Sequence, residues 1–142
     1  MNGMLRFKED GHLDPALTDP ATRTLHADTF LGSWVNTNRK TQGIEGINIS
    51  LAEDVLWVSA SGVGANDPIQ WPATRAKVLA NLEEEAGQRA VALAVTFEFG
   101  FMKAETYLRI NKGVLVIVLF NTFLDGSGRS NYVNREFFYR QE

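Results

Sequence analysis

The sequence contains no cysteine and only two histidines, and these absences exclude several kinds of functional site. Without cysteine the chain has no disulfide, no thiolate metal ligand and no cysteine nucleophile. Both histidines, His12 and His26, lie near the N-terminus, so we expect neither a histidine metal site nor a Ser-His-Asp triad in the rest of the chain. The sequence therefore predicts a protein that holds no metal and uses no cofactor.

Long apolar runs and an excess of basic charge are also missing. No segment approaches the run of about eighteen apolar residues that a membrane-spanning helix needs, and charged residues near the N-terminus interrupt any secretory signal. The net charge is −3 and the 14 Lys and Arg are scattered, which argues against nucleic acid as a partner. We therefore expect a cytoplasmic protein without a membrane span.

Apolar residues, in contrast, make up 44% of the 142 residues, enough to bury the core of one domain. Residues 1–29 combine glycine, proline and acidic residues without a regular period, which predicts an irregular N-terminal arm. From Phe30 onward, short runs of β-branched and aromatic residues are separated by turn-forming residues at spacings near ten. This rhythm is typical of an antiparallel meander and predicts a β domain over residues 30–142.

Eight such runs are expected to form strands. They occupy residues 32–39, 44–51, 55–60, part of 69–85, 91–99, 101–110, 114–120 and 131–140. The fourth run is the least regular, because Trp71 meets Pro72 and residues 74–85 also have good helical propensity. We favour a strand over part of it, since the neighbouring strands need a partner. Eight strands joined by short turns predict an all-β, antiparallel up-and-down barrel.

Two of these runs raise the question of which side chains fill the barrel. In residues 91–99 the larger side chains at odd positions are expected to point inward, although an inward row of Ala90, Ala92 and Ala94 would leave more free volume. The run from Val114 to Phe120 is apolar on both faces. We expect it to be covered on both faces, by the N-terminal arm or by a second subunit in a homodimer.

The opening of the first run, Phe30-Leu31-Gly32-Ser33-Trp34, resembles the Gly-x-Trp signature of the lipocalin and calycin barrels. The resemblance implies a lipocalin-like barrel in which Trp34 plugs the closed end. It also implies that an arginine of the last strand, Arg135 or Arg140, packs across the indole ring. The chain lacks the disulfide of secreted lipocalins, and residues 38–43 leave no room for the helical lid of fatty-acid-binding proteins.

The function we expect first is the binding of a small hydrophobic or amphipathic molecule in the barrel lumen. The mouth is predicted at the glycine-rich loop 61–68 and at the turns near Gly100 and Asp125. Aromatic residues near these segments are the predicted ligand-binding residues, namely Trp57, Trp71, Phe97, Phe99, Tyr107 and Tyr132.

An enzyme without a cofactor is the alternative. Glu105 and Tyr107 share one face of the sixth run, and Tyr132 and Glu136 share one face of the last. If either pair points inward, the carboxylate can act as general acid or base and the tyrosine can stabilise an oxyanion, as a cyclase or isomerase of a hydrophobic substrate requires. Otherwise these residues form cross-strand pairs on the exterior. A third hypothesis is a fully packed barrel that acts through its surface.

Overall fold

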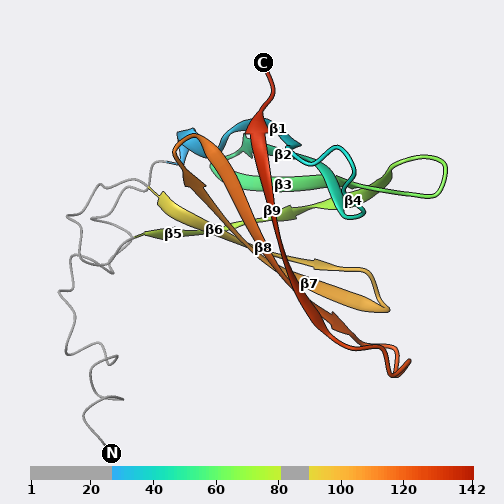
Figure 1. Ribbon diagram of the computed structural model, residues 1–142. Coiled ribbons are helices and arrows are strands. Elements are labelled where there is room, and N and C mark those ends of the chain that lie inside the picture. Colours follow the sequence, from blue (N-terminus) through green and yellow to red (C-terminus); the bar gives the residue numbers. More distant parts are fainter. Residues whose placement is uncertain (1–26, 81–89) are drawn as a thin grey trace, which may run out of the picture.

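The computed structural model describes residues 27–80 and 90–142, which form a nearly closed, antiparallel all-β barrel (Figure 1). A single turn of 3-10 helix, η2 (Asp28–Phe30), precedes the strands. Most of the predicted N-terminal arm, residues 1–26, lies outside the described residues, as do residues 81–89. The nine strands are β1 (Gly32–Asn36), β2 (Ile44–Ala52), β3 (Val55–Gly62), β4 (Ile69–Arg75), β5 (Lys77–Ala80), β6 (Ala90–Glu98), β7 (Met102–Asn111), β8 (Val114–Phe123) and β9 (Tyr132–Arg140).

The strands are hydrogen-bonded in the order β4-β3-β2-β1-β9-β8-β7-β6-β5. Every neighbour in this order is antiparallel, and most are consecutive in the chain. The exception is the pair formed by β1 and β9, in which Trp34 lies opposite Arg140 and Asn36 lies opposite Phe138. This pairing joins the two ends of the meander, so the predicted up-and-down topology is confirmed.

The structure has nine strands where the sequence predicts eight, because the fourth predicted run is divided at Ala76. Residues before Ala76 pair with β3, and residues after it pair with β6. The side chain of Ala76 is buried and its backbone N–H still donates to the carbonyl of Leu56. One bent strand thus passes from one edge of the sheet to the other, and the predicted strand is confirmed as far as Ala80.

Pro72 lies within β4, where its missing N–H has a structural consequence. The register between β3 and β4 shifts by one residue between the pairs Ala60–Trp71 and Val58–Thr74. The bulge falls at Pro72 and Ala73, and β4 has only one hydrogen-bonded neighbour. Proline is tolerated at such positions because no ladder hydrogen bond is required of it.

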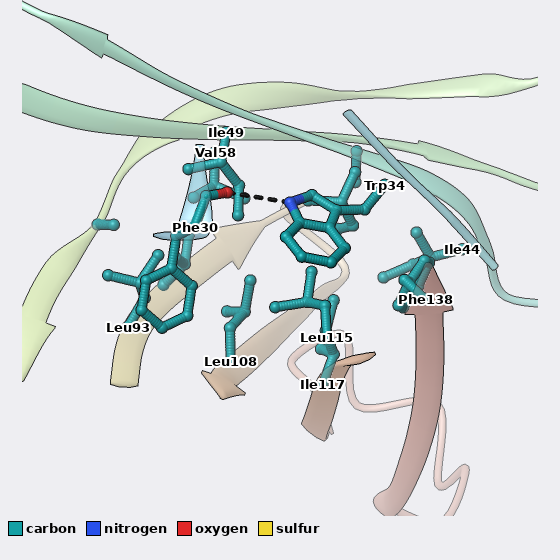
Figure 2. Close-up of a cluster of buried hydrophobic side chains, with 14 of the residues drawn as sticks. Phe30, Trp34, Ile44, Ile49, Val58, Leu93, Leu108, Leu115, Ile117 and Phe138 are labelled. Carbon is teal, nitrogen blue, oxygen red and sulfur yellow. Dashed lines mark hydrogen bonds between the residues drawn. The ribbon is translucent and has the colours of Figure 1, made fainter. Parts of the chain in front are cut away.

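The barrel interior is filled by alternate residues of the strands. In β6, Ala90 is buried at the start of the strand and Val91 is half-buried, but from Leu93 onward the buried residues are Leu93, Val95 and Phe97, so the larger side chains point inward there as predicted. Figure 2 shows the centre of this core, where side chains from the two halves of the sheet surround Trp34. Residues that the figure labels around it include Ile49, Val58, Leu93, Leu108, Leu115, Ile117 and Phe138.

The inward residues of β8 are fully buried, but its outward face is only partly covered in the structure. Val114, Val116 and Val118 are half-buried and Phe120 is exposed. The expectation that both faces are covered is therefore not met by the described residues. Among those same residues, no helix has the length and apolar character that crossing a bilayer requires.

Candidate ligand-binding site

The two ends of the barrel differ, and the first is closed by Trp34. The indole is 2% exposed and its Nε1 donates to the carbonyl oxygen of Phe30 at 3.0 Å. The guanidinium of Arg140 lies over the ring, 4.3 Å from its centroid, and also donates to the carbonyls of Leu31 and Thr29. These contacts fix η2 across the end of the barrel on the left of Figure 1.

The closed end requires glycine at position 32, two residues before Trp34. The φ angle of Gly32 is +126°, a backbone conformation that other residues rarely adopt. A Cβ atom at this position would also lie 2.9 Å from Nη1 of Arg140. Glycine therefore permits both the turn out of η2 and the close passage of the guanidinium.

The arginine that packs on Trp34 is Arg140, not Arg135. Arg135 lies on the opposite face of β9, where its guanidinium is 5.5 Å from the ring centroid of Phe137. The two arginines are five positions apart, and an odd difference in position places them on opposite faces of a strand. The choice of Arg135 as the partner of the plug is wrong for this reason.

The other end of the barrel contains a cavity of about 280 Å³. It lies where β3, β6 and β8 end and where β2, β4, β7 and β9 begin. The connections between β3 and β4, β6 and β7, and β8 and β9 all lie on the right of Figure 1. The lining residues are Gln42, Gly43, Ile44, Gly62, Val63, Ile69, Trp71, Phe99, Phe101, Met102, Leu119, Asn121, Tyr132, Asn134 and Glu136.

One wall of this cavity is aromatic. Trp71 packs edge-on against Phe97 and Phe99, with centroid separations of 5.1 and 4.9 Å. Gly62 makes room for the indole, since a Cβ atom there would lie 2.7 Å from Nε1 of Trp71. Phe97 itself is fully buried and supports the wall from the core side without lining the cavity.

The opposite wall is polar and is organised by the carboxylate of Glu136. Its Oε1 accepts hydrogen bonds from Nδ2 of Asn36 at 3.0 Å and from the hydroxyl of Thr41 at 2.5 Å. Its Oε2 accepts a longer bond, 3.3 Å, from the backbone N–H of Ile44. Gly43 has no side chain at the point where a Cβ atom would lie 2.8 Å from Oε2. The carboxylate thus ties β9 to β1 and to the start of β2.

A second polar group on this wall is an amide pair. The buried Asn121 donates from Nδ2 to Oδ1 of Asn134 at 2.8 Å, and both residues line the cavity. Tyr132 lies beside them on β9 and is half exposed. The wall therefore presents one carboxylate, two amides and a phenol to the cavity.

The structure separates the predicted site residues into two groups, apart from Phe97, which is buried in the core behind the cavity. Trp71, Phe99, Tyr132 and Glu136 line the cavity. In contrast, Trp57, Glu105 and Tyr107 lie on outward positions of β3 and β7, alternating with fully buried neighbours. Their assignment to the lumen is wrong, and Glu105 instead forms an exterior ion pair with Lys103 at 3.1 Å.

Several lining residues were missed because they carry no distinctive chemistry. Ile44, Met102 and Leu119 are ordinary apolar residues, and Asn121 is one polar residue in an otherwise apolar strand. Thr41, which donates to Glu136, also gave no signal of its own. An inward asparagine in β8 was the one clue available, since buried amides require hydrogen-bond partners.

The loop after β8 is an ordinary polar turn at the rim. The backbone N–H of Ser127 donates to Asp125, and Arg129 pairs with the same carboxylate at 2.8 Å. The hydrogen bonds from Ser127 hold the pKa of Asp125 below its ordinary value, and the charge of Arg129 adds to this effect. Arg129 also stacks on Phe123 and Phe101, the second of which lines the cavity.

No known protein family, no curated protein and no solved structure matches this chain. The structure is compatible with a lipocalin-like barrel through its meander order, its closure by β1 and β9, and the packing of Arg140 on Trp34.

Proposed function

We propose that the protein binds a small amphipathic molecule in the cavity at the open end of the barrel. The closed end, sealed by Trp34 and Arg140, has a larger hollow of about 520 Å³ beside η2, but the lining of that hollow includes Asp28, Asp54, Arg75 and Lys77. The observation that carries the proposal is the lining of the cavity at the open end, where Trp71 and Phe99 accompany Asn121 and Glu136. The volume of about 280 Å³ is near the lower end of the range for small-molecule pockets, about 300–1,000 Å³. An aromatic wall facing a few polar groups is the usual composition of such a pocket.

Uptake of a neutral fluorescent probe tests this proposal. We expect Prodan, a naphthalene dye whose emission shifts to the blue in apolar surroundings, to bind with one site per chain. Leu119→Trp should weaken this binding at least tenfold, because residue 119 points inward and the larger ring fills the cavity. The measurement is a fluorescence titration at constant dye concentration.

Thr96→Trp is the matched control, because residue 96 is exposed on the outward face of β6. The control should bind the probe like the original protein, and circular dichroism should show that both variants are folded. Equal binding by Leu119→Trp would place the probe elsewhere and contradict the proposal. Absence of any uptake by the original protein would contradict it as well.

Acid–base catalysis on a bound hydrophobic substrate is the second candidate. It now depends on Glu136 and Tyr132, because these two candidates line the cavity while Glu105 and Tyr107 do not. The contacts made by Glu136 favour binding, since three donors already occupy its oxygens. Conversion of a bound compound by the original protein, abolished in Glu136→Gln with binding retained, would favour the enzyme instead.

A further inference from the structure

We infer that the ligand of this cavity is a small aromatic or aliphatic amine that binds as a cation with its nitrogen at Glu136. This inference rests on the proposed function, because it assigns a chemical class to the molecule in the same cavity. It follows from the charge of the cavity wall, from the unoccupied acceptor capacity of the carboxylate and from the aromatic rings that face it.

Among the lining residues within the described part of the chain, Glu136 alone is charged. Neither of the two ion pairs formed within residues 27–80 and 90–142 involves it. Arg129, a basic residue that packs on the lining residue Phe101, is already paired with Asp125. The wall therefore carries an uncompensated negative charge, which repels a carboxylate such as a fatty acid and attracts a cation.

The carboxylate also has room for one more donor. Two carboxylate oxygens together accept about four hydrogen bonds. Oε1 of Glu136 accepts two from Asn36 and Thr41, whereas Oε2 accepts only the 3.3 Å bond from Ile44. A ligand N–H at Oε2 would complete the set, and charge-assisted bonds of this kind are stronger than bonds between neutral groups.

The aromatic wall suits the same class of ligand. The rings of Trp71, Phe99 and Phe101 face the cavity and can pack on an apolar body. Their faces also attract a cation within about 6 Å of the ring centroid. The limited volume restricts the body to about one or two rings or a short alkyl chain.

Three compounds of equal size and different charge test the inference by displacement of Prodan. We expect 2-phenylethylamine to compete at least tenfold more strongly than 2-phenylethanol, and phenylacetate to compete more weakly than the alcohol. In Glu136→Gln the advantage of the amine over the alcohol should disappear. The alcohol reports whether the variant is still folded and able to bind.

Glu105→Gln is the matched control, because it makes the same change of charge on the outward face of β7. It should leave the preference for the amine unchanged. If the original protein binds Prodan and the alcohol but not the amine preferentially, the inference fails while the proposed function stands. If Prodan does not bind at all, the proposed function itself fails.

A different observation, the outer face of β7, β8 and β9, carries a second inference. Residues 27–80 and 90–142 have twelve exposed large apolar side chains, and five of these lie on this face: Tyr107, Phe120, Val133, Phe137 and Tyr139. The half-buried valines of β8 run between them. We propose that a second copy of this chain covers the face, because a two-fold rotation brings arginines of one copy opposite aromatic residues of the other.

The register of β8 with β7 and β9 arranges the outward residues of this face in rows across the three strands. Tyr107, Val118 and Arg135 lie opposite one another across the three strands, and so do Arg109, Val116 and Phe137. A two-fold axis along β8 places Tyr107 opposite the partner's Arg135 and Arg109 opposite the partner's Phe137, which are favourable cation–π pairs. An axis across the strands through the row of Val118 would instead place each Arg135 against the partner's Arg135, which charge repulsion opposes.

Phe120→Glu tests the dimer by sedimentation velocity. The original protein should sediment with twice the mass of the 15.8 kDa chain. In the variant two carboxylates would meet on the axis beside Glu105, so we expect the monomer. Trp57→Glu, which places a charge on the outer face of β3, should remain dimeric. A monomeric original protein, or a dimeric Phe120→Glu, would overturn the proposal.

Discussion

Trp34→Ala is expected to lower the free energy of unfolding by about 3–5 kcal/mol, the range for removing a buried large aromatic side chain. The indole is almost fully buried at the closed end of the barrel. Its loss leaves a cavity, removes the donor to the carbonyl of Phe30 and takes away the surface on which Arg140 packs. Urea denaturation at constant pH measures the effect as a lower midpoint with an unchanged slope.

Trp57→Ala provides the matched control for this experiment. Trp57 is the same residue type in the same sheet, but it lies on the outward face of β3 and is 36% exposed. We expect it to cost less than about 1 kcal/mol, as surface substitutions usually do. Similar losses for the two variants would show that Trp34 does not close the barrel.

Phe138→Ala should lower the free energy of unfolding by about 3–5 kcal/mol, whereas Phe137→Ala should cost about 1 kcal/mol or less. The two residues are adjacent on β9, and their exposed fractions are 0% and 42%. Chemical denaturation at low protein concentration compares the two folded monomers without a contribution from dimerisation. The reverse order of effects would mean that β9 pairs one residue out of register.

This pair of variants also tests the ligand site. Glu136 and Phe138 share the inward face of β9, because they are two residues apart. A shift of one residue would turn Glu136 out of the cavity and Arg135 into it. The stability measurement therefore checks the geometry on which the amine inference depends, without any ligand being present.

The sequence predicts most of the strands because their side chains alternate with a period of two. In β7 the apolar and charged positions separate cleanly, and the residues at Ala104, Thr106 and Leu108 are buried. The same pattern favours an outward position for Glu105 without deciding it, and the burial of its neighbours in the structure rejects it as a lumen residue. The strand ends also agree, as at the turn formed by Lys112 and Gly113 with positive φ.

Where a strand is apolar on both faces, the pattern cannot decide which face is buried. Phe137, Phe138 and Tyr139 are consecutive aromatic residues on β9, so either Arg135 or Arg140 was an acceptable partner for Trp34. Trp57 lies among Val55, Leu56 and Val58 and has the same ambiguity. The register across β1 and β9 resolves the first case, and such pairing is a property of the whole sheet.

The division of the fourth strand was not predictable for a related reason. Residues 69–80 contain no glycine that would mark a bend. The strand changes its pairing partner at Ala76, and this change depends on how far the sheet has curved. The sequence could not predict the cavity either, because a cavity depends on the distances between residues that lie far apart in the chain.

The change of partner at Ala76 leaves one seam in the wall of the barrel, since β4 has no ladder hydrogen bonds to β6. Trp71 bridges this seam to Phe97 and Phe99 through ring contacts. The cavity lies directly beside it, lined by Ile69 on one side and Phe99 on the other. Side-chain packing of aromatic rings, rather than a ladder of backbone hydrogen bonds, therefore holds β4 against β6 beside the cavity.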